Sequence, residues 1–177
     1  GVGHVFAVIV GKVGDDLQEA QLAILAYKDV DGSPLVEHIL DTAGQKGTGK
    51  WTATAALDEG VPLTLISEAV FSRCLSAMKD ERVTAAAVFD RIIPPFTGDK
   101  ELFVENIRQA LYASKIVSYA QGYALMRDAA RHYGWTLNDG GIALMWRGGC
   151  IIRSAFLGKI KEAYEENPQL ENLLLSP

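Results

Sequence analysis

Apolar residues recur along most of this chain at the three- and four-residue spacing of helices, and convincing two-residue alternation is missing. The pattern predicts a helix over about 15–27, ended by the turn at 31–34, and a second helix that begins after Pro34. A third helix is predicted from about 50 to 60. The predicted fold class is therefore all-α.

Stronger helix signals follow in the middle of the chain. Pro62 stands where a first helical turn tolerates proline, and the apolar positions that follow to Met78 predict a core helix. Asp99 is the predicted N-cap of a long helix over 102–133, whose many small residues allow close packing on more than one side. The segment 142–164 is also helical in pattern, with Gly148 and Gly149 inside it, and a polar tail begins at Pro168.

Length, charge and cysteine usage narrow the class of protein. A chain of 177 residues with 49% hydrophobic residues suits one globular domain with a substantial core. The net charge of −5 argues against nucleic acid as the main partner, and the longest early apolar run, 5–10, is too short to cross a membrane. Cys74 and Cys150 are expected to be buried free thiols, and the expected location is cytoplasmic. Gly1 suggests a processed or excised piece of something longer.

The stretch from Gly44 to Trp51 has the composition of an anion site. Three glycines let backbone N–H groups approach a ligand, two lysines add positive charge, and the start of a helix adds its partial positive end. A nucleotide-binding P-loop is the first alternative, but that motif needs Ser or Thr directly after the lysine, where this chain has Trp51. A plain surface turn between helices is the other alternative.

Arg73 is the second unusual feature, because it lies between Phe71 and Cys74 in a mostly apolar helix. A guanidinium in such a place needs an anion, either a ligand or a carboxylate such as Glu68 or Asp80. Both partners stay open at this point. Arg147 and Arg153 raise the same question and are expected to have structural roles.

Other chemistry is sparse. His4, His38 and His132 show no metal-ligand spacing with each other or with the cysteines, so no metal site is predicted. The nucleophile elbow Gly-x-Ser-x-Gly does not occur, and the carboxylates on predicted helices resemble solvated faces more than an acid/base pair.

Four long blocks resemble the 6-phosphogluconate dehydrogenase family. They are Ala43–Thr52, Glu68–Cys74, Ala110–Gly122 and Ile142–Ser154. The resemblance covers about 27–177, and blocks of this length and order exceed what a short motif supports. It implies part of the C-terminal all-helical domain, which builds the dimer interface and closes one side of the substrate pocket. In the family, the residues that fall on Lys46, Thr48 and Arg73 bind the substrate phosphate.

The resemblance divides the chain into a divergent segment at 1–26 and a helical substrate-binding and dimerisation domain at 27–177. It implies a homodimer that acts on 6-phosphogluconate, oxidising it with NADP and releasing carbon dioxide to give ribulose 5-phosphate in the pentose phosphate pathway.

The family's Rossmann domain, which binds NADP, and its catalytic lysine and glutamate precede the matching region. The tail that completes the partner's phosphate site follows it. This chain is therefore expected to hold no catalytic or cofactor-binding residue and to be inactive alone. The alternative is a non-catalytic helical packing or oligomerisation module derived from the enzyme.

Overall fold

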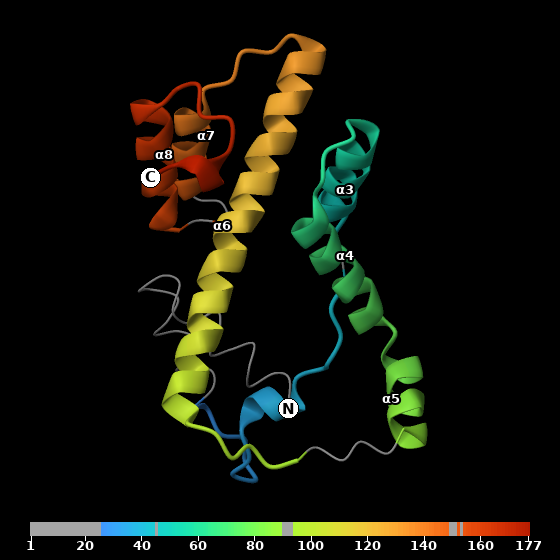
Figure 1. Ribbon diagram of the computed structural model, residues 1–177. Coiled ribbons are helices and arrows are strands. Elements are labelled where there is room, and N and C mark those ends of the chain that lie inside the picture. Colours follow the sequence, from blue (N-terminus) through green and yellow to red (C-terminus); the bar gives the residue numbers. More distant parts are fainter. Residues whose placement is uncertain (1–25, 45, 90–93, 149–151, 153) are drawn as a thin grey trace.

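The computed structural model describes residues 26–44, 46–89, 94–148, 152 and 154–177 (Figure 1). The helical elements are η1 (Leu35–His38), α3 (Thr48–Asp58), α4 (Thr64–Ala77), α5 (Lys79–Val88), α6 (Lys100–Tyr133), α7 (Asp139–Arg147), α8 (Phe156–Glu166) and η2 (Leu173–Leu175). Within these ranges, β-pairing is limited to an isolated antiparallel bridge between Lys28 and Pro34. The predicted all-α fold class is confirmed.

The long helix α6 is the axis of the molecule (Figure 1). Its C-terminal half has α7 and α8 on one side and α3 with α4 on the other. At its start the Asp99 carboxylate accepts hydrogen bonds from the backbone N–H groups of Glu101 (2.8 Å) and Leu102 (3.1 Å), as the sequence predicts. At its end Gly134 takes a left-handed conformation with φ 68°, which glycine adopts without steric cost.

The larger of two cores joins α6 to α7 and α8. Leu157 and Ile160 of α8 are almost completely buried in it. The ring of Tyr123 packs 5.1 Å from that of Tyr164 and 5.5 Å from that of Trp146. The buried members of this core are Tyr119, Ala120, Tyr123, Ala143, Leu157, Ile160, Tyr164, Leu170 and Leu173. The segment after Pro168 thus contributes two buried leucines, where the pattern predicts a polar tail.

The smaller core joins α6 to α3 and α4, and its buried members are Ala56, Val61, Leu63 and Leu125. Helix α4 has no side-chain cap of its own at Leu63. Instead, the Gln121 side chain of α6 accepts a hydrogen bond from Leu65 N–H (3.0 Å) and donates one to Thr64 Oγ1 (2.9 Å). A glutamine from another helix therefore satisfies a donor that the start of α4 would otherwise leave open.

Three further sequence expectations differ from the structure or lie outside it. The helix predicted after Pro34 is a single 3₁₀ turn, η1, which ends at His38. No residue of α4 is buried, and Phe71 is 66% exposed, so the prediction of a core helix is wrong for this chain. Most of the helix predicted at 15–27 lies outside the described residues.

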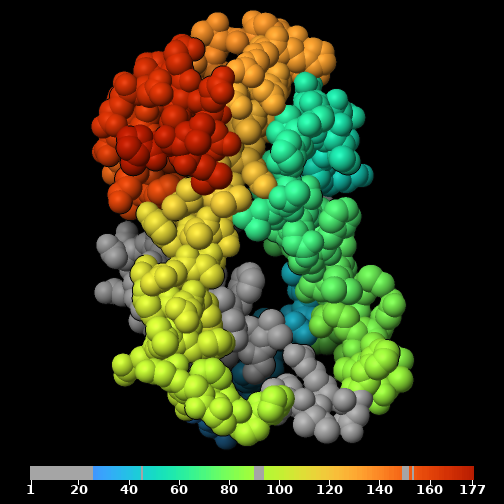
Figure 2. Space-filling model, in the orientation of Figure 1, coloured from blue at the N-terminus to red at the C-terminus, as the bar shows by residue number. Residues whose placement is uncertain are grey.

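Many large apolar side chains are exposed on α4, on and just after α5, and at the start of α6. Helix α5 and the end of α4 stand apart from the N-terminal half of α6 (Figure 2). Side chains exposed there include Phe71, Leu75, Met78, Val83, Val88, Phe89, Leu102, Phe103 and Val104. An amphipathic pattern shows that a face is apolar, but it does not say which part of a larger assembly covers it. Among the described residues, no helix is long and apolar enough to cross a membrane.

Leu157→Ala is expected to lower the free energy of unfolding by about 2–5 kcal/mol, because it leaves a cavity in a fully buried site. Urea unfolding of the chain measures this change. The matched control is Leu57→Ala, since Leu57 is 82% exposed. Equal losses in the two variants would show that α8 does not anchor the core.

Buried tyrosines make stability depend on pH at the alkaline end. Burial raises the pKa of Tyr164 to about 12. The pKa of Tyr123 is also raised, mainly by burial and to a smaller extent by the neighbouring Tyr164. The folded state therefore favours the neutral phenols. Their contribution to stability is complete below about pH 10, the pKa of tyrosine in an unfolded chain, and it declines as pH rises toward about 12.

We expect Tyr164→Phe to make the alkaline loss of unfolding free energy less steep. Urea unfolding at a series of pH values, with a titration of tyrosinate absorbance, tests this. An unchanged pH slope in the variant would contradict the assignment.

Candidate anion-binding site

The first turn of α3 is shaped for a negatively charged ligand. Its N-cap is Gly47, whose φ of 106° suits glycine, and no side chain caps the helix there. Trp51 N–H donates to the Gly47 carbonyl at 2.9 Å and closes the first helical hydrogen bond. The N–H groups before Trp51 have no acceptor inside an α-helix, so they can bind an anion.

Close packing of α3 on α4 brings the second helix to this turn. A Cβ on Gly49 would lie only 2.8 Å from Cγ2 of Val70, so a larger residue at position 49 would force Val70 or its helix to shift. Arg73 lies one turn beyond Val70 on α4. Its Nε donates to the Gly44 carbonyl at 2.7 Å, and its Nη2 donates to the same oxygen.

This contact answers the question that Arg73 raises in the sequence. Its partner in the structure is a backbone carbonyl, whereas Glu68 accepts a hydrogen bond from Ser72 at 3.2 Å. The two bonds to Gly44 use two of the five N–H donors of a guanidinium. The structure thus joins Arg73 to the loop of Lys46 and Thr48, and Thr48 is the first residue of α3. Lys46, Thr48 and Arg73 are all exposed and accessible to a ligand.

A second set of hydrogen bonds holds the segment that leads into the loop. Arg82 of α5 donates to the Asp41 carboxylate at 3.0 Å, to the Asp41 carbonyl at 2.6 Å and to the Ser76 carbonyl at 2.9 Å. Ala43 N–H donates to the Ser76 hydroxyl at 3.0 Å. The hydrogen bond from Arg82 and its positive charge lower the pKa of Asp41. Sequence reasoning misses these partners, because two of the acceptors are backbone carbonyls, which leave no residue-type signal.

Other polar clusters in the described part of the chain serve different purposes. Lys115 donates to the Ser154 hydroxyl at 2.9 Å and joins α6 to the start of α8; burial lowers the pKa of this lysine. Single ligand atoms of Asp29, Asp31 and His38 lie within 4.8 Å of one another. Ser33 also bonds Asp31 and contacts His38 at 2.6 Å, which makes this group an exposed, hydrogen-bonded turn.

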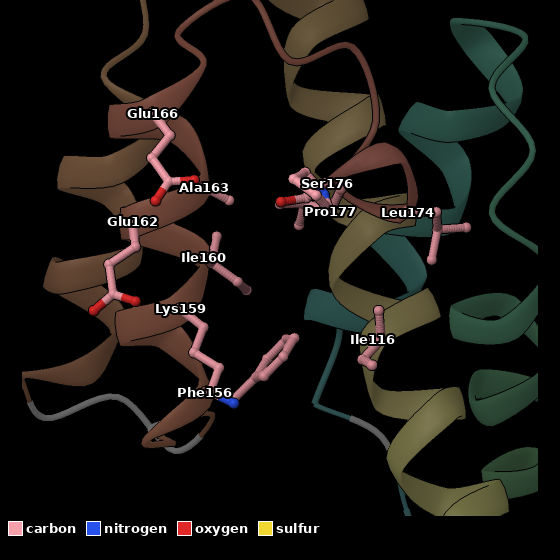
Figure 3. Close-up of a pocket in the computed structure, with 11 residues that line it drawn as sticks. Ile116, Phe156, Lys159, Ile160, Glu162, Ala163, Glu166, Leu174, Ser176 and Pro177 are labelled. Atoms are coloured by element: carbon pink, nitrogen blue, oxygen red, sulfur yellow. The ribbon is translucent and has the colours of Figure 1, made fainter.

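A further cavity lies away from the α3 loop. Figure 3 shows it between α8 on one side and α6 with the C-terminal tail on the other. Its volume is about 560 Å³, and Phe156 and Ile160 line its apolar part. Glu162 and Glu166 line it together with Lys159, so the two carboxylates outnumber the one ammonium that an anion would meet there. The α3 loop is the better candidate for an anion.

Comparisons with known proteins agree with the resemblance. The family model for the C-terminal domain of 6-phosphogluconate dehydrogenase matches residues 12–177, which begins earlier than residue 27. A decarboxylating 6-phosphogluconate dehydrogenase of Cunninghamella elegans is 63% identical over 165 residues, which are 93% of this chain and 34% of that protein. The human protein of the same name is 62% identical over 163 residues, which are 90% of this chain and 33% of that protein.

A solved structure of Plasmodium falciparum 6-phosphogluconate dehydrogenase matches the fold with a TM-score of 0.85 and 39% identity. The match covers 99% of this chain and 38% of that one. The Plasmodium enzyme was solved in its apo form, in complex with its cofactor NADP⁺ and in complex with its substrate 6-phosphogluconate. The chain spans about a third of the length of the curated relatives it matches. With this match in sequence and fold, the chain belongs to the 6-phosphogluconate dehydrogenase family, within its C-terminal domain.

Proposed function

We propose that this chain is the substrate-binding and dimerisation part of a decarboxylating 6-phosphogluconate dehydrogenase. The domain comprises residues 27–177, and Lys46, Thr48 and Arg73 bind the phosphate of 6-phosphogluconate. The single observation that carries the proposal is the contact of Arg73 with Gly44, because it joins a guanidinium from α4 to the lysine-containing loop at the start of α3. The names of the relatives supply the substrate.

The chemistry of the loop suits a phosphate dianion. The first turn of α3 offers N–H donors and the positive end of a helix dipole, and the Thr48 hydroxyl is a further donor. Lys46 contributes a mobile ammonium, and Arg73 contributes a planar donor pair that matches two phosphate oxygens. Three of the five N–H donors of Arg73 are not used by Gly44, and these donors are available to the anion. Arg73 therefore both shapes the loop and binds the ligand.

The role of this chain in the reaction is positioning. A remote phosphate held in place converts binding energy into alignment of the carbon that reacts elsewhere on the substrate. When bound to the full protein, NADP would supply the hydride acceptor. Since the family match of this chain is to the C-terminal domain, we assign NADP to another part of the full protein.

The alternative function is a helical module retained for packing alone. The exposure of Lys46, Thr48 and Arg73 favours phosphate binding, since exposed polar side chains add little to a core. The two functions differ in one measurable property. A packing module has no affinity for phosphate esters that depends on these three residues.

We expect Lys46→Ala to raise KM for 6-phosphogluconate about tenfold or more, because it removes a charge-assisted contact to phosphate. The assay uses a full-length chimera in which residues 12–177 replace the matching segment of the Cunninghamella elegans enzyme. Lys50→Ala is the matched control, equal in charge and assigned no phosphate contact, and it should cost clearly less. Arg73→Lys should also raise KM, since an ammonium cannot make a bidentate bond.

Equal damage from Lys50→Ala and Lys46→Ala, with a silent Arg73→Ala, would mean that the loop acts through bulk charge. The three-residue assignment would then be wrong. NADPH production by the isolated chain of 177 residues, free of contaminating enzyme, would contradict its expected inactivity.

Exposed apolar side chains support the dimerisation part of the proposal. Leu102 at the start of α6 is 59% exposed, and Leu75 of α4 is exposed to the same degree. Burying such side chains in a second copy yields the hydrophobic free energy that homodimer interfaces use.

Sedimentation velocity is expected to show twice the chain mass. Leu102→Glu should shift the chain toward monomer, whereas Leu57→Glu on α3 should not. A parent chain that stays monomeric at high concentration contradicts the dimer.

A further inference from the structure

We propose that Arg82, acting with Ser76, is a positioning residue for phosphate binding: it holds segment 41–44 so that the α3 loop keeps its binding shape. The inference rests on the proposed function of Lys46, Thr48 and Arg73. Neither Arg82 nor Ser76 is assigned a contact with substrate.

The geometry places Arg82 where three chain segments meet. From α5 it reaches Asp41, at 3.0 Å to the carboxylate and 2.6 Å to the carbonyl, and it reaches the Ser76 carbonyl in the last turn of α4 at 2.9 Å. Its side chain is 29% exposed, whereas that of Asp41 is 73% exposed. Arg82 is thus the less exposed partner, and its Nε is buried without an acceptor in the described part of the chain. A mostly buried guanidinium that joins these segments is a fixed point for the stretch of chain entering the loop.

Ser76 anchors the same segment two residues further along, at Ala43. Its hydroxyl accepts from Ala43 N–H at 3.0 Å, and the next residue, Gly44, is held by Arg73. Residues 41, 43 and 44 are therefore each bound to α4 or α5. Helix α3 begins at Thr48. Three residues, 45–47, separate the last anchor from the helix.

A short loop between two anchors loses little conformational freedom when a ligand binds. Glycine-containing loops have many accessible backbone states, and ordering them on binding reduces affinity. If the anchors at 41 and 43 are lost, the loop has to be ordered by the phosphate itself. Loss of these anchors is therefore expected to weaken phosphate binding and to change the rate of the chemical step little.

A purely structural role for Arg82 is the competing explanation. Its backbone N–H donates to the Met78 carbonyl at 3.0 Å, so the residue also lies at the junction of α4 and α5. A residue that only supports this junction would affect stability and every kinetic constant together. A positioning residue would affect the constants that involve phosphate.

The test uses the full-length chimera with Arg82→Lys, which keeps the charge but loses the planar fork, and with Ser76→Ala. Arg108→Lys is the matched control, because Arg108 pairs with Glu105 on α6 and has the same chemistry at a site without a loop. The measurements are KM and kcat for 6-phosphogluconate, KM for NADP, and Ki for inorganic phosphate as a competitor.

We expect Arg82→Lys to raise KM for 6-phosphogluconate and Ki for phosphate by the same factor, about three- to tenfold, with KM for NADP unchanged. Ser76→Ala should move the same two constants in the same direction by a smaller factor, and Arg108→Lys should move neither. If Arg82→Lys fails to fold, Asp41→Asn weakens the same contact from its exposed side. It is then expected to raise the same two constants.

Unchanged KM and Ki in Arg82→Lys, with Lys46→Ala damaging both, would overturn the positioning role and leave the proposed function intact. A loss of thermal stability with a parallel change in KM for NADP would also overturn it, in favour of the structural role. If Lys46→Ala is silent as well, the proposed function fails and the positioning role fails with it.

Discussion

The position of the candidate site depends on hydrogen bonds between the side-chain amide of Gln121, in α6, and the first residues of α4. Helix α4 begins without a cap from its own sequence, and Gln121 supplies both an acceptor for Leu65 N–H and a donor to Thr64. This pair of bonds, with Leu125 packed beside it, sets where α4 lies on α6. Since α4 carries Val70, Arg73 and Ser76, the arrangement of the loop follows from that docking. The polar contact between α6 and α4 thereby affects the geometry of the α3 loop, which is far from Gln121 in the sequence.

Helix α6 combines two different environments along one continuous rod. Its C-terminal half is enclosed by two cores, and its buried positions, such as Tyr123 and Leu125, face different partners. Its N-terminal half presents apolar side chains to solvent in this chain. Helix α6 has 34 residues and is longer than the two described cores, so they enclose only part of it. The uncovered half is consistent with a chain that represents a third of the length of its relatives.

Local signals predict local structure well. The bounds of α6 follow from Asp99 and the apolar pattern to Tyr133, and the loop is correctly expected to precede a helix, because caps and glycines act within a few residues. The failures are of a different kind. The sequence pattern overestimates the burial of α4, since periodicity identifies an apolar face and not its cover. The 3₁₀ turn after Pro34 shows that a proline start signal does not determine how far a helix continues.

The candidate site is predictable in composition and unpredictable in its contacts. Residue type and resemblance identify Lys46, Thr48 and Arg73, and their role is still a proposal. The acceptor of Arg73 is a backbone carbonyl 29 positions earlier, which no residue type indicates. Sequence reasoning misses Arg82 and Ser76 for a similar reason, since two of the three acceptors of Arg82 are backbone carbonyls and Ser76 bonds a backbone N–H. Long-range contacts to the main chain become visible only in three dimensions.

The indole of Trp51 places an intrinsic fluorophore beside this loop. Its ring lies against Gly47, where an added Cβ would be 3.5 Å from the ring, and the residue is 67% exposed. The indole therefore lies beside the glycine end of the loop and remains open to solvent. An anion that settles on the first turn of α3 alters the polarity and the field around this ring. The fluorescence of Trp51 can therefore report anion binding at the first turn of α3 without an attached label.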